Sequence, residues 1–179
     1  MLGRIAGVAL LVAATASGVV YAAEPYGFGR PATPREIAGW DIEISPDGAG
    51  LPPGHGGVGQ GEAIFAEKCA SCHGPHGEGK RMDQLVGGIG TLSDKKPVKT
   101  VGSFWPYATT LFDFVRRAMP LNAPQSLTPD EVYAVSAYIL FLNGIVPQDA
   151  TLDARTLARI KMPNRDGFVS AYPGANAKP

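Results

Sequence analysis

The stretch Cys69-Ala70-Ser71-Cys72-His73 decides how this chain folds. Two cysteines separated by two residues at the end of a helix project toward one side, where their thiols can match two substituents of a rigid planar ring. The histidine that follows can then bind a metal at the centre of that ring. This is the c-type haem attachment pattern, in which the thiols add to the haem vinyl groups and the imidazole binds iron. The sequence therefore predicts one covalently attached haem c, held by Cys69, Cys72 and His73.

Three other uses of the two cysteines fit the sequence less well. A thioredoxin-like redox pair belongs in a βαβ unit, and the glycine-rich segment after His73 shows no strand pattern. A zinc site would have to recruit His76, which stands too close to His73 for the usual finger spacing, and the sequence has no second cysteine pair. A structural disulfide, common in exported proteins, would not call for the adjacent histidine. The motif therefore favours haem.

The second axial ligand decides what a bound haem can do, because methionine raises the reduction potential and closes the site, whereas an open position allows ligand chemistry. Met119 is the candidate, since it ends a helical stretch and precedes Pro120 at the start of a turn-prone loop. Met82 stands too near the haem-binding histidine in sequence to reach round the ring, and Met162 lies in a segment expected to be irregular. A bis-histidine site through His55 is the alternative. We predict that Met119 is the distal ligand.

Four residues near the second predicted helix are candidates for holding the haem propionates: Trp105, Tyr107, Arg116 and Arg117. An arginine fork suits a carboxylate, and the indole N–H and the phenol O–H are hydrogen-bond donors. A solvated basic pair beside aromatic core residues explains the same pattern equally well.

Three main helices are expected, and they define an all-α fold around one covalent haem. Apolar residues recur at helical spacing in residues 59–69 and 107–119. The helix of residues 128–143 is the best marked, because it opens with a Thr-Pro-Asp-Glu capping box and ends before a glycine. Gly61 is expected to permit close crossing of the first helix by the last. The glycine-rich segment 74–102 is expected to wrap the haem edge, since glycine lets the backbone approach closely.

The chain divides into four segments by composition. Residues 58–144 form the haem-binding domain, and the Gly- and Pro-rich flanks 23–57 and 145–179 are expected to be irregular extensions. Residues 1–22 are predicted to be a signal peptide, because a basic residue precedes an apolar stretch and small residues stand at the cleavage site. An uncleaved anchor helix is the alternative, since the apolar run is close to the roughly 18 residues that begin to span a bilayer. A periplasmic location follows, membrane-anchored if the signal is not cleaved.

Beyond the haem motif, Gly61-Glu62-Ala63-Ile64-Phe65, Met119-Pro120 and the capped last helix together resemble the class I cytochrome c family. The flanks resemble something narrower, the cytochrome subunits of bacterial sulfur-compound oxidation. The nearest kinds are the cytochrome subunit of Sox-type sulfur dehydrogenase and the cytochrome partners of molybdenum sulfite dehydrogenases. The stretches that carry this second resemblance are Gly29–Thr33, Gly39–Ile42, Tyr107–Leu111, Arg117–Pro124 and Met162–Phe168.

The resemblance implies a cytochrome c fold in which Cys69 and Cys72 attach the haem, His73 is the proximal ligand and Met119 the distal one. It implies an electron-transfer protein or subunit, not an enzyme. Such a protein accepts single electrons from a periplasmic sulfite or sulfur dehydrogenase and passes them to a downstream cytochrome or oxidase. A haem sensor or small peroxidase with a labile distal ligand is the alternative.

Two features bear on the partner. Some sulfur dehydrogenase cytochromes carry a second haem domain, whereas this chain has one motif, so the resemblance leaves the particular partner open. The sixteen basic residues are balanced by sixteen acidic ones, so the composition offers no bulk charge for a nucleic-acid partner.

Overall fold

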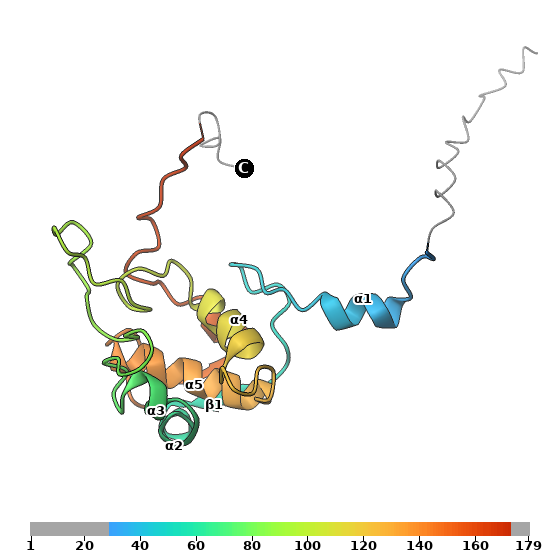
Figure 1. Cartoon of the computed structure of the whole chain (residues 1–179), viewed down its shortest axis with the longest axis horizontal. Helices are drawn as coiled ribbons and strands as arrows, with labels where there is room; N and C mark the ends of the chain where they lie inside the picture. Colours follow the sequence, from blue (N-terminus) through green and yellow to red (C-terminus); the bar gives the residue numbers. More distant parts are fainter. Residues whose placement is uncertain (1–28, 173–179) are drawn as a thin grey trace, which may run out of the picture. The chain divides into compact units, whose positions relative to one another are not determined.

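The computed structural model describes residues 29–172, which fall into two units, residues 29–40 and residues 41–172 (Figure 1). The first unit contains helix α1 (Pro34–Trp40). The elements of the second unit are β1 (His55–Gly57), α2 (Val58–Lys68), α3 (Ala70–His73), α4 (Ala108–Ala118), α5 (Pro129–Leu142), β2 (Thr151–Asp153) and α6 (Ala154–Leu157). The three expected main helices are therefore confirmed as α2, α4 and α5, each within about a residue of its predicted bounds.

Helix α5 is the centre of the second unit, and it packs against both α2 and α4. Its start is built as the sequence predicts: the Thr128 hydroxyl accepts from the Glu131 backbone N–H at 3.3 Å, and the Glu131 carboxylate accepts from the Thr128 N–H at 2.8 Å. Every residue from Val132 to Leu140 is buried. Such a helix is apolar all round because neighbours cover it on all sides.

The crossing of α2 and α5 depends on Gly61, as predicted. A Cβ atom at this position would overlap the carbonyl oxygen of Ala134 and lie 2.8 Å from Cβ of Tyr138. The absence of a side chain lets the two backbones approach closely. One turn further along α2, Phe65 packs against Tyr138 with ring centroids 5.4 Å apart.

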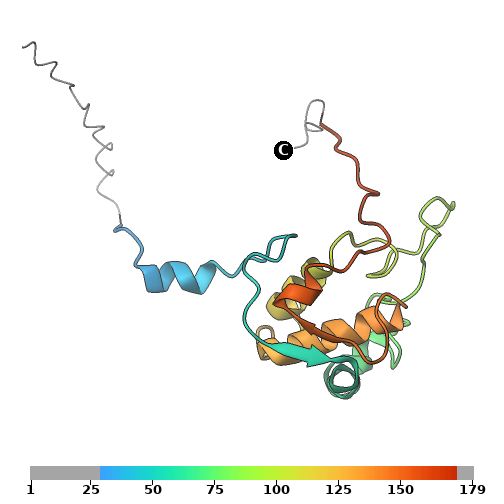
Figure 2. The same ribbon diagram turned by 180° about the vertical axis from the view of Figure 1, so that it is seen from behind.

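The flanks, expected to be irregular, contain regular structure. Strand β1 pairs antiparallel with β2, with Gly56 opposite Leu152, and the two strands lie side by side in Figure 2. Helix α1 lies in the first flank, and α6 follows β2 in the second. The expectation missed these elements because a three-residue strand has no detectable alternation and its partner lies about a hundred residues away.

The C-terminal flank also contributes to the core. Leu152, Leu157 and Met162 are all less than 5% exposed. Beyond them, the Asn164 amide donates to the Phe104 carbonyl at 2.7 Å, and the rings of Phe104 and Phe168 lie 5.2 Å apart. Residues 145–168 therefore pack against the domain to which they belong.

The remaining sequence expectations concern segments without regular structure. Residues 74–107 contain no helix or strand, in agreement with a wrapping loop. Within the described residues, 29–172, no helix is long and apolar enough to cross a membrane. The predicted signal peptide, residues 1–22, lies outside the described residues.

Candidate functional site

A large cavity of about 770 Å³ opens in the second unit, between α2, α3, α4 and α5. Residues from the segments 82–85, 99–105 and 119–127 complete its walls. A cavity of this size suits a cofactor or another ligand of that scale. Among its apolar lining residues are Phe65, Leu85, Val101, Leu111, Phe114, Val115, Leu121, Leu127, Val135 and Ile139.

The haem attachment motif lies in the wall of this cavity, where α2 ends and α3 begins. Cys69, Cys72 and His73 all line it. Helix α2 ends at Lys68, and the Cys69 carbonyl accepts from the N–H groups of both Cys72 (3.1 Å) and His73 (3.0 Å). This tight turn presents three functional side chains to one cavity, as the spacing predicts.

No disulfide joins the two cysteines, so both sulfur atoms are available to attach a cofactor. Burial, reinforced by the neighbouring Cys72, raises the pKa of Cys69 to about 11. The Cys69 side chain is therefore neutral at ordinary pH, which suits the apolar wall in which it lies.

The orientation of His73 is set by a backbone group. Its Nδ1 lies 2.8 Å from the carbonyl oxygen of Asp83, which can only accept a hydrogen bond, so Nδ1 carries the proton. The other ring nitrogen, Nε2, is then left with a lone pair for a metal. Metal-binding histidines usually donate their other ring N–H to such a carbonyl, because this hydrogen bond fixes both the tautomer and the ring plane.

Met119 belongs to the same cavity but comes from a different element. It is the C-cap of α4, where its N–H donates to the Val115 carbonyl, and its half-buried side chain lines the cavity. Met82 also lines the cavity, although it is 44% exposed. The structure thus brings two thioethers to the site.

The other side chains weighed as ligands lie elsewhere. Met162 is 1% exposed within the apolar core and is absent from the cavity lining. Its segment has no regular secondary structure, as expected, but it is packed against the core. His55 lies in β1, where its N–H donates to the Asp130 carboxylate at 2.8 Å, and it does not line the cavity either. The bis-histidine alternative gains no support from this position.

Only one of the propionate candidates lines the cavity. Trp105 does so, with its ring 5.7 Å from that of Phe114. Arg117 instead pairs with Asp113 one turn back along α4, at 2.8 Å, and this pairing raises its pKa. The Tyr107 ring faces the guanidinium of Arg165 at 4.4 Å. Tyr107 and Arg117 therefore have partners outside the lining.

Arg116, the fourth candidate, also lies outside the cavity lining, and its guanidinium donates to the Ile42 carbonyl at 3.5 Å. Sequence reasoning missed the polar residues that do line the cavity, among them Lys99 and Gln84. Lys99 belongs to the exposed Lys-rich segment 95–99, whose composition indicates only a solvated loop. No local signal identifies it.

The donor set fits a covalently bound haem. Two thiols and an imidazole come from one turn, a thioether comes from another element, and the space between is lined mainly by apolar groups. Apolar lining suits a porphyrin ring, and neutral imidazole with thioether is a known axial ligand set. Among the described residues, 29–172, no cluster of three or more His, Cys, Asp or Glu offers an ordinary metal site instead.

Comparison with known proteins identifies the family. The family model of cytochrome c matches residues 58–143. A chain in the crystal structure of the sulfane dehydrogenase SoxCD from Paracoccus pantotrophus is 45% identical in sequence to this chain. The two superpose with a TM-score of 0.77, and the match covers 84% of this chain and 73% of the SoxCD chain. The chain belongs to the class I c-type cytochromes. This cytochrome is an electron-transfer protein rather than a catalyst, and its family implies covalently bound haem c.

A second relative is the thiosulfate dehydrogenase of Psychrobacter arcticus strain 273-4. The cytochrome is 28% identical to it over an alignment of 126 residues that covers 59% of the cytochrome and 37% of the relative. The cytochrome therefore spans little more than a third of that enzyme's length. The likeness to SoxCD extends further than the family model: it covers 84% of the chain, which is more than residues 58–143 and either flank together, so it includes parts of both flanks.

Proposed function

We propose that this cytochrome carries one haem c in the periplasm and accepts single electrons from a molybdenum-dependent dehydrogenase of sulfite or another inorganic sulfur compound. One observation carries the proposal. The likeness to the sulfane dehydrogenase SoxCD covers 84% of the chain, and so reaches beyond the domain that all cytochromes c share. The flanks are the part of the chain that can adapt a general carrier to one donor.

The residues of the cavity suit this role. Bound haem would supply the one-electron couple between ferric and ferrous iron. Cys69 and Cys72 would attach it, and His73, oriented by the Asp83 carbonyl at 2.8 Å, would hold the iron through Nε2. The thioether of Met119 would be the second axial ligand, which would favour ferrous iron and so raise the reduction potential. The apolar lining excludes water.

The haem count and location have separate support. The sequence contains two cysteines, both in the attachment motif, so it holds one such haem site. Export of residues 23–179 after cleavage at Ala22 would place the protein in the periplasm, where c-type haem attachment and sulfur-compound oxidation meet. A downstream cytochrome or oxidase would then receive the electrons.

Stopped-flow reduction tests the proposal. The ferric cytochrome is mixed with the purified sulfite or sulfur dehydrogenase of the same organism, with and without its sulfur substrate, and the haem absorbance is followed. Fast reduction that depends on the substrate is expected, with a rate that falls at high salt if charges steer the encounter. No reduction above that given by a non-cognate dehydrogenase would refute the sulfur-oxidation partner and leave a general electron carrier.

A further inference from the structure

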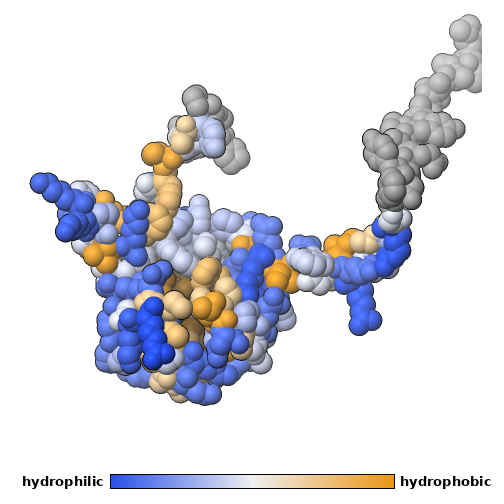
Figure 3. All heavy atoms as spheres, viewed as in Figure 1, coloured by the Kyte–Doolittle hydropathy of each residue, from blue (hydrophilic) through white to orange (hydrophobic). Residues whose placement is uncertain are grey.

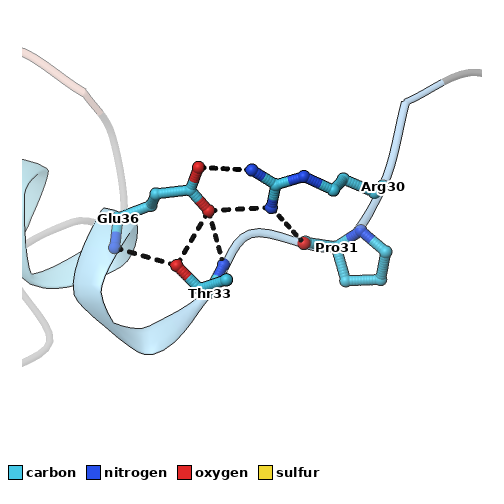
Figure 4. A network of polar contacts seen from close by, with 4 residues as sticks. All are labelled: Arg30, Pro31, Thr33 and Glu36. Atoms are coloured by element: carbon cyan, nitrogen blue, oxygen red, sulfur yellow. Dashed lines mark hydrogen bonds and ion pairs between the residues drawn. The ribbon is translucent and has the colours of Figure 1, made fainter.

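Helix α1 in the N-terminal flank is held together by its own polar contacts. Arg30 forms a bidentate pair with the Glu36 carboxylate, whose contact through Nη1 measures 2.8 Å (Figure 4). The same carboxylate accepts from the backbone N–H of Thr33 at 2.8 Å and from its hydroxyl at 2.9 Å. The Thr33 hydroxyl accepts in return from the Glu36 N–H at 3.3 Å. This is a complete capping box closed by an arginine clamp.

These contacts matter because the helix is short. It has seven residues, none of them buried, and a helix of this length is not stable in water by propensity alone. Arg30, followed by Thr33, lowers the pKa of Glu36 to about 2, so the clamp stays charged at any ordinary pH. A pre-ordered helix loses less conformational entropy when it binds a partner.

Within the first unit, residues 29–40, the apolar side chains of α1 are left uncovered. Trp40 is 89% exposed and Ile37 is 52% exposed. They stand three residues apart, so they share one face of the helix. Figure 3 shows hydrophobic surface on this segment, beside charged groups. Exposed tryptophan costs hydration free energy without benefit to the isolated chain, and tryptophan is among the residues that contribute most to protein–protein binding.

The likeness to SoxCD bears on what could bind this face. The likeness covers 84% of the chain, whereas the cytochrome c family model stops at residues 58–143. A segment outside the haem domain is thus shared with a chain found in a sulfur dehydrogenase. A carrier that uses only its haem face has no need of an ordered helix with an exposed tryptophan.

We propose that α1 is a preformed anchor that inserts Trp40 and Ile37 into an apolar groove on the catalytic subunit of the sulfur dehydrogenase. The inference rests on the proposed function and deepens it. The anchor binds as a helix in a groove and is separate from the cavity through which the cytochrome exchanges electrons. It raises the lifetime of the complex without taking part in electron transfer.

The test compares affinity with electron-transfer rate. Trp40→Ala and the double variant Ile37→Ala/Trp40→Ala are titrated as full-length holoproteins with the purified catalytic subunit of the dehydrogenase, by calorimetry and by stopped-flow reduction. Loss of a tryptophan anchor is expected to raise Kd about 30-fold. The increase should persist at high salt, because it does not arise from charge. The reduction rate at saturating dehydrogenase should stay unchanged.

The matched control is Tyr172→Ala, which removes another exposed aromatic side chain (78%) from the opposite flank. Its Kd should stay within about twofold of wild type. Arg30→Ala should weaken binding by a few-fold only, since it removes the clamp and leaves the apolar contacts. Unchanged haem absorbance and thermal unfolding in all variants would show that the haem domain is intact.

Several results would overturn the inference. If wild type is bound and reduced but Trp40→Ala binds equally well, α1 is not the anchor although the proposed function stands. If light scattering shows that the wild-type cytochrome alone is a dimer and Trp40→Ala is a monomer, with Kd for the dehydrogenase unchanged, the face is covered by a second copy. If wild type is neither bound nor reduced, the proposed function fails and this inference fails with it.

Discussion

Replacing Gly61 by alanine should separate the two helices that carry the core. The added Cβ would overlap the Ala134 carbonyl and stand 2.8 Å from Cβ of Tyr138. Because carbon atoms prefer separations of about 3.5–4.0 Å, α2 and α5 must move apart by about 1 Å. Neither contact is the end of a flexible side chain, so no rotamer change can avoid the movement. The packing of Phe65, which is 1% exposed, against Tyr138 would loosen with it.

The magnitude follows from two opposing effects. Alanine is favoured over glycine inside a helix by up to about 1 kcal/mol. Overpacking a dense core costs about 1–3 kcal/mol, and more where backbone atoms are involved. We expect Gly61→Ala to lower the free energy of unfolding by about 2 kcal/mol. With a urea dependence of about 2 kcal/mol per molar, the unfolding midpoint would fall by about 1 M.

The control lies in the same helix. A Cβ at Gly59 would meet no atom within 4 Å, so Gly59→Ala gains helix propensity without a clash. Its free energy of unfolding should rise by about 0.5 kcal/mol. Urea unfolding of the holoproteins, followed by circular dichroism, measures both variants. A Gly61→Ala midpoint at or above that of wild type would refute the argument that close backbone contact sets this crossing.

Four further predictions concern the site and its supports. Met119→Ala should abolish the far-red sulfur-to-iron absorption band of the ferric protein and allow rapid carbon monoxide binding in the ferrous protein, because we propose the Met119 thioether as the distal ligand. Asn143→Ala should cost about 1–3 kcal/mol in unfolding free energy, because the buried amide accepts from the Gly87 N–H at 3.0 Å, and hydrogen exchange of the Gly87 amide should accelerate. Thr128→Ala should cost about 1 kcal/mol by thermal unfolding, because it removes the N-cap of α5. Glu131→Gln should make the free energy of unfolding less dependent on pH in the acid range. The Thr128 N–H lowers the pKa of Glu131, so the charged carboxylate stabilises the fold above a pH of about 4.5. This contribution is lost as the pH falls through the lowered pKa.

Each of these has a contradicting outcome. Met82→Ala is the control for the distal ligand, because both methionines line the cavity. Loss of the band in Met82→Ala with retention in Met119→Ala would reverse the assignment. Unchanged exchange at Gly87 in the Asn143 variant would show that the hydrogen bond does not hold the loop. A Thr128→Ala variant as stable as wild type, or a Glu131→Gln stability profile that stays parallel to that of wild type as the pH falls below about 4.5, would contradict the capping argument.

The sequence predicted the site better than it predicted its surroundings. The motif at residues 69–73 was sufficient to bring the side chains of Cys69, Cys72 and His73 to one cavity, because they lie on one turn and their spacing alone sets their direction. Met119 was predicted from its place at a helix end, and it does line the cavity. Tyr107 and Arg117 do not, because residue type alone cannot distinguish a donor to a cofactor from a donor to a neighbouring side chain: Arg117 is satisfied by Asp113 within its own helix.

Local sequence determined the elements whose stabilising contacts are also local. The capping box at Thr128, the three main helices and the haem attachment turn all depend on residues within four positions of one another. Tertiary structure alone decided the pairing of β1 with β2, the burial of Met162 and the hydrogen bond that orients His73. Those features depend on contacts between segments distant in the chain, or on backbone carbonyls that every residue possesses. A pattern of residue types carries no information about either until the chain has folded.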